Sequence, residues 1–390
     1  MAKIELEWLH WPETKALTQA IVPLRFVGGC VRDALLARKV RDIDAATPIL
    51  PQEVMQRLKG AGIKAIPTGI DHGTVTAVIE GKHFEITTLR RDVSTDGRHA
   101  TVAFSEDWAE DAARRDFTMN ALFCDLQGNI FDYYGGEQDA RTGHVRFIGE
   151  ARERIREDAL RILRFFRFFA YYGQGEPDAQ GIAACAELAQ LIDGLSGERI
   201  QQEMLKLLVA PRPTQTLELM QKHGVLKHVM PQDMKPGILA KLAQGKPAIV
   251  ALALLLRSAP DADVQAVSNR WKLSRAQHKR LLELCDAEQS WSVADERIYK
   301  RQIRAWGAEL FGERVAIAVA EGSDEQHAST ALQLAQNWEI PTFPITGEDL
   351  IAFGMQPGRA LGEKLKSLEE LWETGNYSEG RDALLTRLKQ

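Results

Sequence analysis

Two glycines and two aspartates near the N-terminus have the spacing of a site for a phosphorylated ligand and a metal ion. Gly28 and Gly29 stand where a short β-type run gives way to a helical one. Glycines at a helix N-terminus let a phosphate approach free backbone N–H groups. Asp42 and Asp44 are two positions apart on the next predicted strand, so both side chains point to one face. Because Mg²⁺ binds carboxylates together with substrate phosphates, this segment predicts chemistry on a nucleoside triphosphate.

Two further charged residues fit this hypothesis. Arg32 lies on the first turn of the predicted helix, where its charge opposes the helix dipole, so we expect a triphosphate oxygen to offset that cost. Glu85 belongs to another β-type run and is a candidate third carboxylate beside the metal ion. An exposed strand residue explains Glu85 equally well. An isolated Asp-x-Asp is usually a solvated turn, and here the glycine pair and Arg32 favour the metal site.

A second cluster, Arg114 to Ala121, has the sequence RRDFTMNA. Arg115 is a candidate ligand of phosphate or ribose, and Asp116 and Asn120 could either bond to ribose hydroxyls or fix the turn. A structural ion-pair network explains part of this cluster equally well.

A third cluster, Glu157 to Arg167, predicts a helix that carries Asp158 and Arg161 on one face. A simple ion pair is one interpretation, and recognition of a nucleobase is the other. Cytosine and adenine present an amino donor beside a ring-nitrogen acceptor, which a carboxylate and a guanidinium complement, whereas guanine and uracil present the reverse pattern. Arg164 and Arg167 lie farther along the helix and could bind phosphate or brace neighbouring elements.

The segments around these clusters predict an α+β fold, with a small mixed-sheet head followed by an all-α neck, body and tail. The expected boundaries are 1–148 for the head, 149–210 for the neck with its recognition helix, and 211–390 for the body and tail. Short β-type runs define the strands of the head, predicted at 24–27, 42–45, 75–79, 83–88, 121–125 and 130–133. Helices of the head are predicted at 31–37 and 51–59, and the polar segment 90–105 is predicted to be a mobile loop.

Composition limits the class of protein. A chain of 390 residues is too long for one ordinary core. The four cysteines form no CxxC pair, which argues against a zinc site or a disulfide framework and predicts a cytoplasmic protein. The longest apolar run, 248–256, is far shorter than the ~20 residues of a membrane span. The net charge of −5 means that any nucleic acid must meet local basic surface.

Taken together, the motifs resemble those of the class II tRNA nucleotidyltransferases, the bacterial CCA-adding enzymes of the polymerase-β-like nucleotidyltransferase superfamily. The resemblance covers nearly the whole chain. The matching segments occur in family order, namely GGxVRD…RDxD at 28–44, the segment 67–75, RRDFTxNA at 114–121, EDxLRxxR at 157–164, and 196–203.

The resemblance implies an enzyme that adds C, C and then A to the 3′ end of tRNA from CTP and ATP, without a template and with release of pyrophosphate. The aspartate pair would bind Mg²⁺, while Gly29 and Arg32 would hold the nucleotide phosphates and Arg115 would contact the nucleotide. Asp158 and Arg161 would select the base. The arginines at positions 164 and 167 match others that line the family's nucleotide pocket.

The resemblance also implies that the helical remainder grips tRNA, and no protein partner is implied. Phosphate contacts are predicted for Lys272, Arg275, Lys279 and Arg280, although ordinary solvated helix faces explain these residues equally well. The segment 96–100 resembles the flexible element that switches the family from C to A addition, which argues against an enzyme that adds only C.

Two alternatives remain. A poly(A) polymerase shares the head motifs, but the basic tail and the arginine-rich run often found in that group are missing from this sequence. A non-catalytic RNA-binding protein of the same fold is the other alternative, and the intact aspartate pair argues against it.

Overall fold

In the computed structural model of the chain, the described residues are 3–96, 99–231, 233–286 and 290–387. The backbone divides into two compact units. The first contains residues 1–236 and 260–274, and the second contains residues 237–259 and 275–390. The predicted catalytic and base-recognition residues all belong to the first unit.

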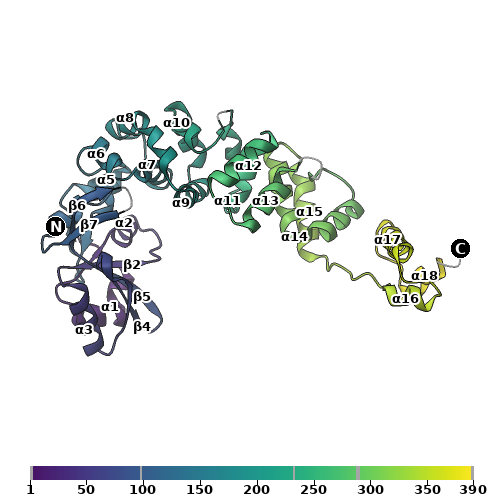
Figure 1. The fold of residues 1–390 in the computed structure, drawn as a ribbon, viewed down its shortest axis with the longest axis horizontal. Coiled ribbons are helices and arrows are strands. Elements are labelled where there is room, and N and C mark those ends of the chain that lie inside the picture. Colours follow the sequence, from purple (N-terminus) through teal and green to yellow (C-terminus); the bar gives the residue numbers. More distant parts are fainter. Residues whose placement is uncertain (1–2, 97–98, 232, 287–289, 388–390) are drawn as a thin grey trace. The chain divides into compact units, whose positions relative to one another are not determined.

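The first unit begins with a mixed sheet (Figure 1). Among the described residues, seven strands pair in the order β3-β4-β5-β2-β1-β8-β9. Only the β2–β5 pair is parallel within this set, and the other neighbours are antiparallel. The strands are β1 Arg25–Val27, β2 Ile43–Thr47, β3 Lys64–Gly69, β4 Thr74–Ile79, β5 Lys82–Thr88, β8 Phe123–Cys124 and β9 Ile130–Phe131.

Helices and short turns surround this sheet. Helix α2 contacts β1 and β2, and helix α3, which begins at Pro51, contacts β3 and β4. The helical elements of the head are η1 Glu7–His10, α1 Pro12–Ala20, α2 Gly29–Leu35, α3 Pro51–Gly60, η2 Ile70–His72, α4 Trp108–Ala113, η3 Thr118–Asn120 and α5 Gly136–Thr142. The buried side chains of β1, β2 and α4 form one core with Phe123 and Ile148.

The rest of the first unit is helical. Its elements are α6 Ala151–Glu157, α7 Leu160–Tyr172, α8 Ala179–Glu187, η4 Ala189–Gly194, α9 Gly197–Leu208, α10 Pro213–Lys222, η5 Leu226–His228 and α12 Asp261–Arg270. Helix α7 packs against α9 and α10. Phe165 and Phe168 of α7 stack around Phe117 and Phe147, so aromatic packing fixes α7 to the segment that follows Asp116.

The second unit is helical among its described residues. It contains η6 Pro236–Lys241, α11 Ala248–Leu256, α13 Arg275–Cys285, α14 Glu296–Ala320, α15 Glu325–Asn337, α16 Gly347–Ala352, α17 Arg359–Thr374 and α18 Arg381–Thr386. Gly307 has a φ of 80° inside α14 and breaks this helix into two. One core joins α14 with α15, and another joins α16, α17 and α18 around Trp372.

The α+β fold with a mixed-sheet head is confirmed, but one predicted loop is wrong and one strand was not predicted. The segment 90–105, predicted to be a loop, contains the antiparallel strands β6 Arg90–Asp96 and β7 His99–Phe104. Their cross-strand pairing supplies order that the polar sequence did not indicate. Strand β3 was also missed, because its side chains are mostly exposed or half-buried and give no alternating pattern. Residues 97 and 98, part of the segment 96–100 singled out above, lie outside the described residues.

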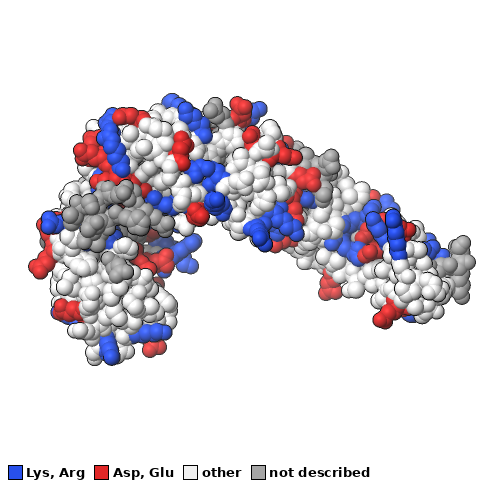
Figure 2. All heavy atoms as spheres, viewed as in Figure 1, with Lys and Arg blue, Asp and Glu red and all other residues white. Residues whose placement is uncertain are grey.

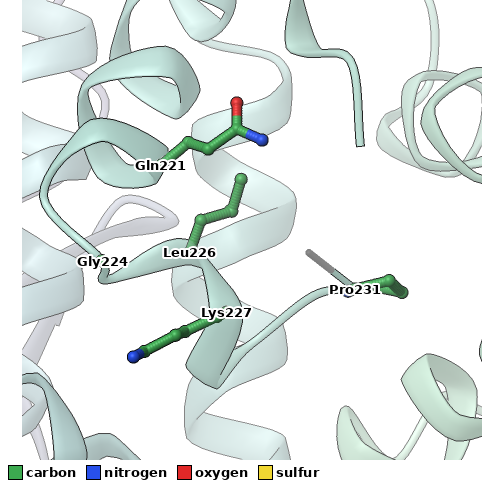
Figure 3. A pocket seen from close by; sticks show the side chains of 5 residues that line it. All are labelled: Gln221, Gly224, Leu226, Lys227 and Pro231. Atoms are coloured by element: carbon green, nitrogen blue, oxygen red, sulfur yellow. The ribbon is translucent and has the colours of Figure 1, made fainter. Parts of the chain in front are cut away.

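One cavity of the helical part lies near the C-terminal end of α10 (Figure 3). Its volume is about 140 Å³, and it is lined by Gln221, Gly224, Leu226, Lys227 and Pro231. Ligand pockets usually measure about 300 Å³ or more, so this cavity is too small for a nucleoside triphosphate. None of the residues predicted to act on a nucleotide lines it.

Candidate active site

The glycine pair forms the turn between β1 and α2. Gly28 has a φ of +75° and precedes the first helical residue, Gly29. A Cβ atom at Gly28 would lie 3.3 Å from Nη1 of Arg115 and 3.5 Å from the carbonyl oxygen of Asn120. Only glycine therefore suits both the backbone conformation and the close approach of the RRDFTMNA segment. The structure brings the first two sequence clusters together at this point.

The two aspartates lie on the neighbouring strand. Asp42 directly precedes β2 and is exposed, while Asp44 lies in β2 and is half-buried. Asp44 pairs in register with Glu85 of the parallel strand β5. Burial, Glu85 and Asp42 raise the pKa of Asp44 to about 6, although the positive charge of Arg115 opposes the rise. Crowded carboxylates with too little compensating charge fit a cation site.

The donor set at this position is a pair of carboxylates. Among the described residues, no group of three or more His, Cys, Asp and Glu side chains is arranged to hold a metal ion. A pair still fits Mg²⁺, which takes one or two carboxylates and completes its sphere with water and substrate phosphates. Glu85 as a third ligand remains a prediction, and the negative charge of Glu85 raises the pKa of Asp44.

Arg32 is buried, with 6% of its surface exposed. Its Nη1 donates to Oδ1 of Asn120 at 2.5 Å, and its Nη2 donates to the hydroxyl of Tyr172 at 2.7 Å. Its Nε donates to Oδ1 of Asp33 at 2.9 Å. A Cβ atom at Gly29 would lie 3.7 Å from Nη2, so the guanidinium lies beside the glycine pair. The charge predicted to meet a triphosphate is thus held in one orientation by three side chains.

Arg115 is positioned by an aspartate that the sequence analysis missed. Asp111 of α4 is 1% exposed, and its Oδ2 accepts hydrogen bonds from Nε and Nη2 of Arg115 at 3.3 and 3.1 Å. Its Oδ1 accepts from Nε of Arg114 at 2.9 Å. Burial by itself would raise the pKa of Asp111, but the two arginines hold it below its ordinary value. The spacing of Asp111 from Arg114 and Arg115, three and four positions, was the available signal.

Asp116 links the second cluster to the third. Its Oδ1 accepts from the amide of Asn120 at 2.9 Å, and its Oδ2 accepts from Nε of Arg164 at 2.7 Å. Arg167 pairs in turn with Glu203 of α9 through Nε at 2.5 Å. Burial favours a higher pKa for Asp116, yet Arg164 and the hydrogen bonds keep the pKa below its ordinary value. Arg164 and Arg167 therefore brace α7 against its neighbours, one of the two roles considered for them.

The predicted continuous helix through Asp158 and Arg161 is broken. Asp158 has extended backbone angles and separates α6 from α7, and its Oδ1 accepts from the backbone N–H of Leu160 at 3.1 Å. No Asp158–Arg161 ion pair is formed in the described structure. Oδ2 of Asp158 accepts from Nη2 of Arg199 at 2.7 Å, and Arg161 pairs with Glu157. The simple ion-pair interpretation is wrong, because each residue has a different partner.

Three family models match consecutive parts of the chain. The "Poly A polymerase head domain" matches residues 24–146, and the "Probable RNA and SrmB- binding site of polymerase A" matches residues 177–233. A model of tRNA nucleotidyltransferase domain 2 matches residues 241–388.

Relatives that match most of the chain point to the same family. The mitochondrial CCA tRNA nucleotidyltransferase 1 of Danio rerio is 36% identical over 380 residues, which cover 94% of this chain and 87% of the relative. The CCA-adding enzyme of Lactococcus lactis subsp. lactis is 32% identical over 382 residues, covering 94% and 92%. The crystal structure of the Bacillus stearothermophilus CCA-adding enzyme in complex with CTP has a TM-score of 0.81 at 27% identity, with 97% of each chain covered.

The chain belongs to the class II CCA-adding enzymes. This confirms the resemblance stated from the sequence motifs. Nucleotidyltransferases of this superfamily generally use a divalent metal, in keeping with the aspartate pair Asp42 and Asp44. Within the residues that the structure covers, no helix is both long and apolar enough to cross a membrane.

Several positioning residues of this CCA-adding enzyme had no predicted role. Arg199 and Glu203 lie on α9 within the segment 196–203, which matched the family as a motif but gave no information about partners. Tyr172, at the end of α7, showed no signal in the sequence, because its partner Arg32 is 140 positions away. Long-range pairs of this kind leave no local spacing to recognise.

The predicted tRNA-binding residues fall in both units, and two of them are paired. Lys272 belongs to the first unit, and Arg275, Lys279 and Arg280 lie on α13 of the second. Arg280 is within ion-pair distance of Glu283, Glu309 and Glu313, and its side chain is 26% exposed. The side chain of Lys279 is 79% exposed and lies 3.7 Å from Glu283. Basic and acidic side chains are interspersed over the visible face (Figure 2).

Proposed function

We propose that this chain adds C, C and A to the 3′ end of tRNA from CTP and ATP, releasing pyrophosphate at each step. The observation that carries the proposal is the convergence at Gly28. Nη1 of Arg115 lies beside this glycine, and the charge of Arg115 acts on the pKa of Asp44. The proximity of the glycine turn, the Arg115 guanidinium and Asp44 supports the proposal, because nucleotidyl transfer requires a phosphate site beside a metal-binding carboxylate.

Asp42 and Asp44 would hold Mg²⁺ in this proposal. When bound, the metal would activate the attacking hydroxyl and stabilise the charge that develops on the leaving pyrophosphate. Burial and the neighbouring carboxylates Glu85 and Asp42 raise the pKa of Asp44 despite the positive charge of Arg115, and a bound divalent cation would supply further positive charge.

The chain's own residues bind and orient the reactants. Gly28 and Gly29 admit the triphosphate close to the backbone, and Arg32 and Arg115 offer charged N–H donors to its oxygens. The 3′ oxygen of tRNA forms a bond to the α-phosphorus while the bond from that phosphorus to the β-phosphate bridging oxygen breaks. The hydroxyl proton is transferred to water as the new ester forms. In this proposal Asp116 and Asn120 would orient the ribose, and their mutual hydrogen bond holds the two side chains together.

Base selection is assigned to Asp158 and Arg161. Asp158 already accepts one hydrogen bond on each oxygen, and each oxygen keeps a further lone pair for an amino group of cytosine or adenine. Arg161 is held by Glu157 and by the carbonyl of Arg154 at 2.8 Å, so its direction is fixed before a base enters. Asp158 has an extended backbone between α6 and α7, so Asp158 and Arg161 lie at the same helix junction.

The remaining assignments belong to the same proposal. Residues 1–148 form the catalytic head, 149–210 the neck, and 211–390 the body and tail that bind tRNA. Lys272, Arg275 and Lys279 are proposed phosphate contacts, whereas Arg280 is the weakest candidate because carboxylates surround it. We place the chain in the cytoplasm, since its four cysteines are far apart in the sequence and form no CxxC pair, which suits a reducing compartment.

The test uses purified protein, Mg²⁺ and a tRNA that lacks its 3′ CCA, with each labelled nucleotide supplied separately and then together. Addition limited to C, C and A supports the proposal. Extended A tracts would show a poly(A) polymerase, and a failure to incorporate any nucleotide would show a protein that only binds RNA.

The Asp42→Ala variant examines the metal assignment in the same assay. We expect nucleotide addition to be abolished while tRNA binding, measured by filter retention, remains within about twofold, because tRNA contacts lie mainly with phosphates elsewhere. Full activity of this variant would remove Asp42 from the site. Glu53→Gln is the control, since Glu53 lies on α3 and pairs only with Arg57 among its described partners.

A further inference from the structure

The hydroxyl of Tyr172, the last residue of α7, closes a triangle of hydrogen bonds with two residues of α2. It accepts from Nη2 of Arg32 at 2.7 Å and donates to Oδ1 of Asp33 at 3.0 Å. Nε of Arg32 donates to the same Asp33 oxygen at 2.9 Å. Each member of the triangle therefore fixes the other two.

We infer that Tyr172 is a positioning residue for the nucleoside triphosphate. Tyr172 acts by orienting the guanidinium of Arg32 toward the glycine pair. The inference rests on the proposed function, because it assigns Arg32 to the triphosphate. It extends that function to a residue far from the recognised motifs. Tyr172 touches no reacting atom and acts only through Arg32.

The chemistry of the hydroxyl supports this role. Burial raises the pKa of Tyr172, the positive charge of Arg32 opposes the rise, and Asp33 adds to it, so the phenol keeps its proton at neutral pH. A protonated phenol can accept from Arg32 and donate to Asp33 at the same time. The ring also lies under the guanidinium, with 4.1 Å from Cζ of Arg32 to the ring centroid. The ring packs against the guanidinium of Arg32, and the hydroxyl fixes the orientation of that guanidinium.

A second contact clamps the same end of α7. Arg38, which follows α2, donates through Nη2 to the carbonyl oxygen of Tyr171 at 2.8 Å, and its Cζ lies 4.6 Å from the ring centroid of Tyr172. Arg164, earlier on α7, reaches Asn120 through Asp116, and Asn120 holds the other nitrogen of Arg32. Helix α7 therefore fixes both terminal nitrogens of Arg32, one directly and one through two side chains.

The Tyr172→Phe variant removes the hydroxyl and keeps the ring. Binding of CTP and of CMP is measured without tRNA, and KM and kcat are measured for CTP and ATP. We expect CTP affinity to fall on the order of tenfold, the effect of losing one charge-assisted hydrogen bond, while CMP affinity stays unchanged. KM should rise by a similar factor for both nucleotides, with little change in kcat.

Tyr171→Phe is the matched control, because the neighbouring hydroxyl donates to the carbonyl of Lys206 at 3.1 Å and does not contact Arg32. We expect it to bind CTP as the wild type does. In an Arg32→Lys background, Tyr172→Phe should have no further effect on CTP binding, since the Nη2 donor is then missing.

Equal loss of CTP and CMP affinity would overturn the inference, as would unchanged CTP affinity, an equal effect of Tyr171→Phe, or a full effect in the Arg32→Lys background. A purely structural role predicts a lower unfolding temperature and fewer active molecules with KM unchanged, which would also overturn it. The binding comparison does not depend on turnover. If the wild type failed to add C, C and A, the proposed function would be wrong. The ratio of CTP to CMP affinity would still test the positioning role of Tyr172.

Discussion

Asp111→Asn tests whether a buried carboxylate holds Arg115 in the candidate site. In the wild type, Oδ1 of Asp111 accepts from Arg114 and from the backbone N–H of Arg90, and Oδ2 accepts twice from Arg115. An asparagine keeps one acceptor and turns an NH₂ group toward one of the two guanidinium groups, where donor faces donor. The variant therefore loses two charge-assisted bonds and the charge that balances two arginines.

The size of the expected loss in unfolding free energy follows from the burial of the Asp111 carboxylate. Asp111 is 1% exposed, and the side chains of Arg114 and Arg115 are 15% and 18% exposed, so solvent screens little of the interaction. Two charged hydrogen bonds at about 1.5–3 kcal/mol each give a cost of about 3–6 kcal/mol. The loss of one partner of a buried pair gives about 3–5 kcal/mol, which we take as the expected cost. The CTP KM should also rise on the order of tenfold, because Arg115 beside Gly28 is no longer held.

The assay is urea unfolding read by hydrogen exchange in peptides that cover α4 and β8, together with steady-state kinetics. Glu110→Gln is the control, since this neighbouring carboxylate is exposed and accepts only from Ser105 among its described partners. A loss below about 1 kcal/mol for Asp111→Asn would refute the reasoning, because an exposed pair gives that value. An equal loss in the control would refute it as well.

The contribution of Asp111 to stability should depend on pH in one direction. The folded pKa of Asp111 is lowered, so its contribution is fully present above the unfolded pKa of about 4 and is lost as the pH falls toward the folded pKa. The stability gap between wild type and Asp111→Asn should therefore be constant near neutrality and narrow below about pH 4. A gap that widened in acid would contradict this assignment.

Three further predictions concern the turn, the neck and the choice of base. Gly28→Ala should cost about 1–3 kcal/mol through strain at a φ of +75° and should raise the CTP KM; Gly60→Ala, where a Cβ would meet nothing within 4 Å, should be neutral in the same thermal and kinetic assays. Glu203→Gln should cost about 2–4 kcal/mol in urea unfolding, because Arg164 and Arg167 of α7 lose a carboxylate that is 5% exposed. Glu198→Gln, at an exposed position, is the control. Equal stability of the two variants would reject a stabilising role for the ion pairs of Glu203. Asp158→Asn should relax selection against UTP and GTP in single-nucleotide incorporation, and unchanged selection would reject its role in base recognition.

Much of the head was predictable because its signals are local. The turn Glu80–Gly81 between β4 and β5, and the turn around Gly128 between β8 and β9, mark hairpins by residue type. The proline at the start of α3 marks its N-terminus. Strands β6 and β7 were not predictable, because a polar sequence without alternation shows no buried face.

The partners of the charged groups were less predictable than their positions. The spacing of Asp158 and Arg161 predicted that both lie on one face of a continuous helix, but the helix is broken between them. Arg280 belongs to a basic run in the sequence, yet Glu309 and Glu313 from another helix lie against it. Ion pairs depend on distances of a few ångströms between segments, which local spacing does not determine.

The sequence by itself determined the chemistry that this chain can support. The glycine pair lies at the turn before α2, and Asp42 and Asp44 lie just before and within β2. Their spacing of two positions predicts one shared face from backbone periodicity alone. The tertiary structure alone decided how Arg32 is oriented. Asn120, Asp33 and Tyr172 meet around its guanidinium, and two of them lie 88 and 140 positions away. A side chain with free torsions takes its direction from whatever packs against it, so only folding could decide that direction.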